Sequence, residues 1–237
     1  RREVVRDLLN RDPQDWNDEL LKDYKSGFEV HARGVKHKTS YGSLFPYKDA
    51  APYKSFYKNV SLYPSYAQGG LSNVWGASIA AYEAEDLRDW PVSLDDLNSY
   101  YGKVLSFMPV SRSRQASIVS EKLGAAHFRE LKMSRQVQAL DARMEGLKNL
   151  DKQHVFSLGG SCLAVGSSHD SDSAKDCVYC GLCMYGCPFS LIYNSVATLN
   201  VLKTHQNFEY RGGIFVESLR ESGGEVQVKV LDLAAGR

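Results

Sequence analysis

The sequence lacks the long apolar runs and the charge excess that mark several large classes of protein. No stretch reaches the roughly 18–20 uninterrupted apolar residues of a membrane-spanning helix, so we expect no membrane span. Lys and Arg number 29 and Asp and Glu 28, a net charge of +1, which excludes a polyanion binder held by bulk charge. Apolar residues make up 43% of the 237 positions, which excludes wholesale disorder and provides for a core.

Several catalytic and cofactor motifs are missing as well. The chain has no G-x-G-x-x-G dinucleotide fingerprint, no Walker loop, no G-x-S-x-G elbow and no HExxH, and its six histidines are scattered. Residues 1–7 show no apolar signal-peptide core, so we expect a cytoplasmic location. No serine or histidine therefore stands out as a catalytic nucleophile or base.

Helical periodicity is present in four segments. It predicts helices over 1–25, 117–150 and 191–204, and a further helix that begins at Ser93 with Asp96 closing a capping box. The buried face of that further helix is predicted to comprise Leu94, Leu97, Tyr101, Val104 and Leu105.

The β signal is concentrated near the end of the sequence. Short β segments are predicted at 208–210 and 214–216, and Val226, Val228 and Val230 then alternate with other residues. The intervening Ser-Gly-Gly at 222–224 predicts a hairpin turn. Residues 158–176 are rich in Ser, Gly, Ala and Asp and are predicted to form a loop.

The most informative feature is a cluster of four of the five cysteines. They follow the spacing Cys177-x2-Cys180-x2-Cys183-x3-Cys187-Pro188, the C-x2-C-x2-C-x3-C-P form of bacterial iron–sulfur proteins. Two-residue gaps let a chain wrap a corner and aim successive sulfur atoms inward. Without a secretory signal, such spacing favours metal or redox chemistry over a disulfide framework.

Three interpretations of the cysteines remain open. The first is an iron–sulfur cluster, either 4Fe–4S or 3Fe–4S, whose fourth ligand is Cys187 or the remote Cys162. The second is a structural zinc site, although zinc usually takes two separated pairs of cysteines. The third is a set of free or disulfide-paired thiols that only shape a turn.

Two other segments have both a functional and a structural interpretation. Residues 69–76, Gly-Gly-Leu-Ser-Asn-Val-Trp-Gly, form a small-residue loop that a flat cofactor or a phosphate could approach, or simply a turn before a helix. Residues 41–66 hold eight aromatic residues, and 31–66 hold six Lys or Arg. Such interleaving suits stacking of single-stranded nucleic acid, but the neutral chain has no nucleic-acid motif, so we expect a packed loop and no nucleic-acid partner.

Taken in order, these segments resemble the glucose–methanol–choline (GMC) oxidoreductases. The shared elements are Gly-Gly-x-Ser-x-Val-Trp-Gly at 69–76, Asp-Trp-Pro-Val at 89–92, Leu-x-x-Tyr-Tyr at 97–101 and the cysteine motif. The nearest branch is the bacterial one with a cysteine-rich motif in mid-chain, and the resemblance spans roughly residues 40–232.

The resemblance implies an FAD-dependent flavoprotein that oxidises the CH–OH group of an alcohol or sugar. It places Gly69, Gly70 and Ser72 against the flavin, with Asn73, Trp75 and Gly76 adjacent and Val216 near the adenine. The family's dinucleotide fingerprint and catalytic histidine would lie outside this chain, so no catalytic residue is expected within it. An electron-acceptor protein is a further implied partner.

We therefore expect residues 1–237 to form a single incomplete α+β domain, part of an FAD-binding domain with helical insertions and a C-terminal hairpin. Its segments are a helical and aromatic region, a flavin-loop and helical segment, the cysteine-motif loop, and a helix with the hairpin, over 1–68, 69–157, 158–190 and 191–237. The expected function is that of an oxidoreductase fragment with an iron–sulfur electron relay. The alternative is a stand-alone iron–sulfur or zinc-stabilised module without flavin.

Overall fold

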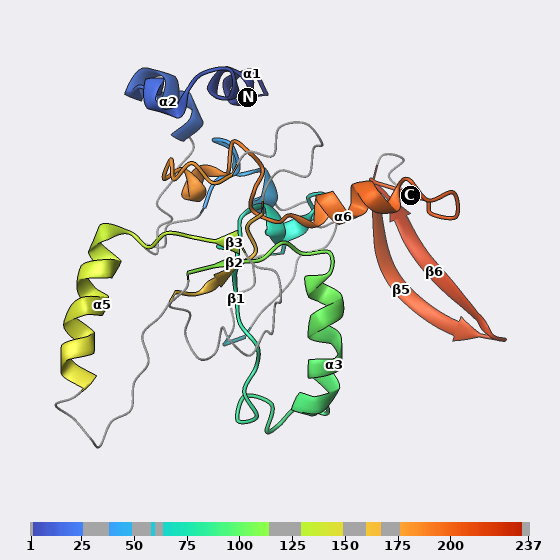
Figure 1. Ribbon diagram of the computed structural model, residues 1–237. Coiled ribbons are helices and arrows are strands. Elements are labelled where there is room, and N and C mark those ends of the chain that lie inside the picture. The colour runs from blue at the N-terminus through green and yellow to red at the C-terminus, as the bar shows by residue number, and fades with distance from the viewer. Residues whose placement is uncertain are drawn as a thin grey trace. The chain divides into compact units, whose positions relative to one another are not determined.

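The computed structural model contains both helices and strands, which confirms the mixed α+β class (Figure 1). It divides into two compact units, the first formed by Arg1–Ser43 with Val74–Tyr193 and the second by Leu44–Asn73 with Asn194–Arg237. Within the described part of the chain, no helix is long and apolar enough to span a membrane. The structure describes residues 2–25, 38–48, 58–59, 64–113, 129–148, 160–166 and 176–233.

The N-terminal part of the first unit is helical, as predicted, with a break in the middle. Helix α1 (Arg2–Leu9) is followed by a short 3-10 turn and then by α2 (Asp18–Lys25). The turn begins at Asp12, whose side chain accepts a hydrogen bond from the Gln14 amide at 2.9 Å. Leu8 and Tyr24 from these helices are buried together with Leu182.

Helix α3 (Leu94–Leu105) begins where the capping box predicted. Ser93 Oγ accepts from the Asp96 amide at 3.2 Å, and Asp96 Oδ2 accepts from the Ser93 amide at 2.9 Å. The expected buried face is wrong in part, because Val104 is exposed and no residue of α3 is fully buried. Tyr101 and Leu105 pack against a small buried cluster, which covers only one edge of the helix.

A small mixed sheet forms the other core of the first unit. Its strand order is β1-β4-β2-β3, with β4 antiparallel to both β1 and β2, and β2 parallel to β3. The buried residues Ala81, Val110 and Cys162 lie together beside it. The strands are β1 (Ser78–Ile79), β2 (Ser111–Arg112), β3 (Arg129–Glu130) and β4 (Cys162–Leu163).

Two of these strands correct the predictions. Strand β4 interrupts the loop expected over 158–176, because the small residues Cys162, in the strand, and Ala164, directly after it, fit into a buried position. Strand β3 lies within the helix expected over 117–150, of which only α5 (Arg135–Lys148) is helical in the described residues. Residues 117–128 of that expected helix lie outside the described part.

The second unit contains helix α6 and a hairpin. Helix α6 (Ser195–Leu202) begins four residues later than predicted, because Asn194 caps it by accepting from the Val196 amide at 2.8 Å. Two 3-10 turns, η2 (Phe45–Tyr47) and η3 (Gly70–Asn73), belong to the same unit.

The predicted hairpin is confirmed as β5 (Ile214–Ser222) and β6 (Glu225–Asp232), a two-stranded antiparallel sheet. Gly223 and Gly224 have φ of 62° and 80°, the left-handed pair that a tight hairpin turn requires. The β segment expected at 208–210 is wrong, since the ladder ends where the Leu233 amide donates to the Gly213 carbonyl. In the described part of the chain, neither β5 nor β6 extends far enough to pair with residues 208–210.

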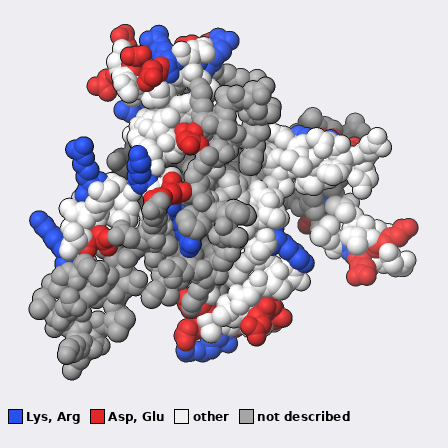
Figure 2. Space-filling model, in the orientation of Figure 1, with Lys and Arg blue, Asp and Glu red and all other residues white. Residues whose placement is uncertain are grey.

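Charged side chains of both signs are interspersed on the described residues of the face shown in Figure 2. This distribution agrees with the near-equal numbers of acidic and basic residues in the sequence.

Candidate functional site

The four clustered cysteines lie on a tightly wound segment, residues 177–190, which we call the cysteine loop. Its backbone enters the left-handed region at Tyr179, Gly181, Gly186 and Ser190, with φ of 56°, 73°, 102° and 53°. Such residues reverse the chain direction over short distances. The tight turns that the cysteine spacing predicted are therefore present.

The N-terminal helices support the cysteine loop from one side. Leu182, 3% exposed, packs with Leu8 and Tyr24. The Tyr24 hydroxyl donates to the Gly186 carbonyl at 2.8 Å, and the Trp16 ring stacks on Phe189 with centroids 6.0 Å apart. The loop is thus fixed by residues that lie some 160 positions earlier in the chain, since Tyr24 and Gly186 are 162 apart.

A second support comes from residues 38–41, which run beside the loop. The Thr39 amide donates to the Met184 carbonyl at 3.0 Å, and the Tyr41 amide donates to the Tyr185 carbonyl at 2.7 Å. The Tyr41 hydroxyl donates to the Cys187 carbonyl at 3.2 Å. Three hydrogen bonds therefore tie this segment to the part of the loop that carries its last two cysteines.

The thiols of the loop lie within electrostatic reach of one another. Desolvation, followed by the charges of Cys187, Cys183 and Cys177, raises the pKa of Cys180. Cys183 is exposed as a whole residue, yet desolvation at its thiol and the charges of Cys187 and Cys177 raise its pKa too. All five cysteines lie in the described residues, and none of them forms a disulfide there.

Several groups around the loop favour the ionised, metal-binding form of these thiols. The Leu191 amide donates to Cys187 Sγ at 3.4 Å, and a backbone hydrogen bond from Leu182 lowers the pKa of Cys180. The ammonium of Lys38 lowers the pKa of Cys183. Lys38 itself is 7% exposed, and its Nζ donates to the Trp75 carbonyl at 2.6 Å.

The chemistry of this donor set fits a thiolate-ligated metal or cluster. Four sulfur atoms on one loop, with amide donors and an ammonium beside them, are the groups that such a centre requires. Among the residues that the structure describes, no three His, Cys, Asp or Glu side chains are gathered around one point at ligand positions. The four-cysteine ligand set therefore stays a prediction.

The fifth cysteine has a different environment. Cys162 is 1% exposed, lies in β4 and packs with Ala81 and Val110. These neighbours are apolar, as in the core of a small domain. Its packing gives the residue a structural role, whatever else it does.

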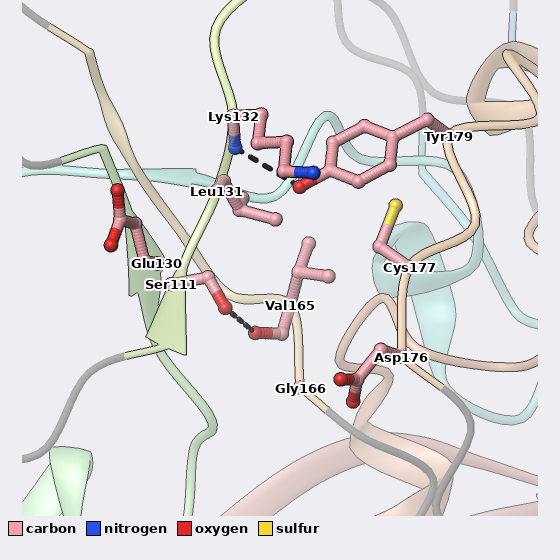
Figure 3. Close-up of a pocket in the computed structure, with 9 residues that line it drawn as sticks. All are labelled: Ser111, Glu130, Leu131, Lys132, Val165, Gly166, Asp176, Cys177 and Tyr179. Carbon is pink, nitrogen blue, oxygen red and sulfur yellow. Dashed lines mark hydrogen bonds between the residues drawn. The ribbon is translucent and has the colours of Figure 1, made fainter.

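Cys177 lines a cavity of about 250 Å³ in the first unit (Figure 3). The Lys132 amide donates to the Tyr179 hydroxyl at 3.0 Å, and Ser111 Oγ donates to the Val165 carbonyl at 2.6 Å. The first of these bonds ties the start of the cysteine loop to the residues after β3, and the second joins β2 to the segment after β4. Cys177 is thus the loop cysteine that borders this cavity.

Four of the residues predicted to bind flavin lie together in and beside η3, and three of them contact the start of α6. A Cβ on Gly69 would lie 2.7 Å from both Asn194 Oδ1 and Val196 Cγ2. Ser72 Oγ accepts from the Ser195 amide at 3.0 Å, and Asn73 Oδ1 accepts from Asn194 Nδ2 at 2.7 Å. Gly70, in contrast, faces open space.

The remaining residues of the predicted flavin set lie elsewhere. Trp75 and Gly76 belong to the first unit, where Trp75 Nε1 donates to the Tyr193 carbonyl at 2.7 Å and Gly76 faces open space. Val216 lies in β5 of the second unit, paired with Val230 and 51% exposed. The structure thus groups four of the seven residues and places the other three in different elements.

The aromatic and basic stretch lies mostly outside the described residues, including Tyr53, Phe56, Tyr57 and Tyr63. Of its described members, Tyr41 supports the cysteine loop, and Tyr66 contacts Phe215 with ring centroids 5.9 Å apart. Both act as packing groups.

Sequence reasoning does not single out Tyr24, Lys38 or Trp16 as partners of the cysteine loop. Each lies more than a hundred positions from it, and none belongs to a motif with the cysteines. The helical spacing of apolar residues would indicate that Tyr24 is buried, but it would not indicate which residues cover it.

Comparisons with protein-family models, curated proteins and solved structures found no match for this chain.

Proposed function

We propose that this chain is part of a GMC-type FAD-dependent oxidoreductase in which Cys177, Cys180, Cys183 and Cys187 hold an iron–sulfur cluster. The substrate class is an alcohol or a sugar, oxidised at CH–OH, and the cluster relays electrons from the flavin toward an acceptor protein. The observation that carries the proposal is the spacing of four cysteines on one tightly wound loop, where the Leu191 amide donates to Cys187 Sγ at 3.4 Å.

The protein's own part in this chemistry is to hold and shield the redox groups. When bound, the flavin supplies hydride acceptance and the cluster supplies one-electron transfer. The buried contact of Leu182 with Leu8 and Tyr24 holds the loop, and the Leu191 amide offsets negative charge on Cys187. The catalytic base is expected outside this chain.

The flavin half of the proposal is supported by the order of motifs and by open backbone at two glycines. Among the described residues, no atom lies within 4 Å of where a Cβ would stand on Gly70, and the same holds separately for Gly76, so a flat ring can approach the main chain at either position. Ser72 and Asn73 already make hydrogen bonds within the second unit. Their side chains would contribute to flavin binding by shaping the loop.

The alternative is a stand-alone module in which the cysteines hold an iron–sulfur cluster or zinc and no flavin is bound. The observation that favours it is that η3 packs on and hydrogen-bonds to the start of α6. These contacts give Gly69, Ser72 and Asn73 a structural role without any cofactor. In this alternative the same four cysteines of the loop are the metal ligands.

Chemical analysis of the protein purified without oxygen separates these functions. We expect iron and acid-labile sulfide in the protein, together with FAD released on denaturation. Iron and sulfide without FAD would favour the stand-alone module, and stoichiometric zinc would favour a structural site. Protein that contains none of these, even after anaerobic reconstitution with iron and sulfide, would contradict the proposal.

A further inference from the structure

The two faces of the β5–β6 hairpin differ in character. Side chains alternate between the faces of a strand, so Val228 shares its face of β6 with Val226 and Val230. Residues paired across the ladder also share a face, which adds Leu219, the partner of Val228, and Val216, the partner of Val230. These five aliphatic residues form one continuous strip, which we call the valine face.

The opposite face of the hairpin carries a ring contact and an ion pair. Phe215 is paired with Leu231, both are partly buried, and the Phe215 ring contacts Tyr66 with centroids 5.9 Å apart. Lys229, next to Val228 and therefore on the opposite face, forms an ion pair with Glu217 at 2.9 Å. The described contact with the aromatic ring of Tyr66 is thus made by the face that does not carry the valines.

The valine face is exposed, although an apolar face of a sheet is normally the buried one. Its five side chains belong to residues that are 44–68% exposed. Five half-exposed aliphatic residues present on the order of 400 Å² of contiguous apolar surface, and patches of this size often mark interaction sites. A two-stranded hairpin is also only marginally stable alone in water. The valine face therefore has the properties of a surface that a partner covers.

The charges of this face indicate what kind of partner fits. Glu221, paired with Val226, lies at the turn end, and Asp232, two positions after Val230, lies at the other end. The described residues of the face include no Lys or Arg. A centre without charge and a charged rim are the anatomy of a protein–protein interface. Such a centre offers nothing to a polyanion, but it matches another aliphatic face of the same size.

A second copy of the chain supplies a face that matches in both size and composition. Two stacked valine faces would bury about 800 Å² in total, which is below the roughly 1,200 Å² of a stable interface and within the range of weak complexes. The area therefore supports a weak, reversible dimer.

We propose that the valine face is a self-association surface, through which two copies of the chain stack face to face about a two-fold axis. The hairpins would pack as the two sheets of a sandwich do, about 10 Å apart. A two-fold interface brings the same patch of both copies together, so the middle pair of the strip, Leu219 with Val228, lies at the axis. The cysteine loop belongs to the other unit, so the dimer requires neither a bound cluster nor a flavin.

Sedimentation velocity of the full chain over a range of concentrations tests the proposal. We expect a reversible monomer–dimer equilibrium in the wild-type protein. Val228→Glu should raise the dissociation constant at least about tenfold, because it buries an unpaired charge in the centre of the contact. Gln227→Glu is the matched control, since it adds the same charge at the next, exposed position on the opposite face, and it should keep the wild-type constant.

Two further variants guard against a misfolded hairpin. Val228→Thr keeps the β-branched shape and should weaken the dimer in the same direction by less. Val228→Lys should weaken it as Val228→Glu does. An equimolar mixture of the Glu and Lys variants should associate more tightly than either alone, because the axis brings the opposite charges together.

Three outcomes would contradict the proposal. A wild-type protein that stays monomeric at every concentration would assign the valine face to a different protein or to another chain segment. A dimer that all three Val228 variants leave unchanged, or that Gln227→Glu weakens equally, would be formed elsewhere. A mixture no tighter than its components would show that the middle pairs do not meet. The iron, sulfide and FAD contents, which test the proposed function, are measured separately and do not depend on these results.

Discussion

Among the individual residues, the five cysteines fall into two environments. Four lie on the cysteine loop, and Cys162 is buried against Ala81 and Val110. Only the four loop thiols have the spacing of a cluster ligand set. The two environments lead to opposite expectations for substitution.

Replacement of Cys180 by Ser, and separately of Cys183 by Ser, should abolish most bound iron and the visible absorbance, because each removes one thiolate from the set. Cys162→Ala should keep both, since its neighbours are apolar. Iron analysis and absorption spectra of the anaerobically purified variants check this. Loss of iron in Cys162→Ala together with retention in Cys187→Ser would instead make Cys162 the fourth ligand.

Substitutions at Gly69 and Gly70 distinguish the collision of an added Cβ from the backbone strain of a positive φ. Both have positive φ, 86° and 53°, but a Cβ would collide with Asn194 and Val196 only at Gly69. Gly70→Ala should destabilise the second unit by about 1–2 kcal/mol through its backbone alone. Gly69→Ala should cost about 1–3 kcal/mol more through overpacking.

Hydrogen-exchange mass spectrometry over α6 measures this difference directly, because the collision lies at the helix start. Faster exchange at 195–202 in Gly69→Ala than in Gly70→Ala is the expected result. Equal exchange in the two variants would show that α6 does not pack on Gly69 as described.

At the scale of elements, α2 is joined to the cysteine loop by one buried side chain. Tyr24→Phe removes the donor to the Gly186 carbonyl and leaves that acceptor buried. We expect a loss of about 1–2 kcal/mol in the free energy of unfolding, measured with denaturant by the fluorescence of Trp16, which stacks on Phe189. Tyr100→Phe, at an exposed tyrosine, should leave the free energy of unfolding unchanged. A similar loss in Tyr100→Phe would show that the effect of Tyr24→Phe does not come from the hydrogen bond to Gly186.

Helix α3 depends on its capping box. Ser93→Ala should destabilise the helix by about 1 kcal/mol at neutral pH, and Ser99→Ala on the same helix serves as the control. The side-chain and then the backbone hydrogen bond from Ser93 hold the pKa of Asp96 below its ordinary value.

The stabilising effect of Asp96 is therefore present above the ordinary carboxyl pKa and is lost as the pH falls through the lowered one. The difference between wild type and Ser93→Ala, followed by circular dichroism during urea unfolding, should narrow under acid conditions. A difference that grows with acidity would contradict the capping box.

Elements with local signals were predictable from the sequence, and those that depend on distant contacts were not. The Ser93 cap and the Gly223-Gly224 turn are encoded within a few residues, and both occur as predicted. Strand β4 escaped prediction because its pairing with β1 comes from residues 78–79, far away in the sequence. The supports of the cysteine loop, Tyr24 and Lys38, escaped for the same reason.

At the scale of the whole molecule, the chain alternates between its two units. It leaves the first unit after Ser43, returns at Val74, and leaves again after Tyr193. Each unit is thus built from two segments separated in sequence, which composition and periodicity do not indicate. The cysteine loop and all of its described supports belong to the first unit, so the central claim concerns that unit alone.

The most direct test of that claim is an absorption spectrum of the anaerobically purified protein, recorded before and after dithionite. The account predicts a broad brown absorbance that bleaches on reduction, accompanied by the structured bands of a flavin. Brown absorbance without flavin bands would keep the cluster at the cysteine loop and leave the stand-alone module as its function. A colourless protein would contradict the cluster, and the four cysteines would then be zinc ligands or structural thiols.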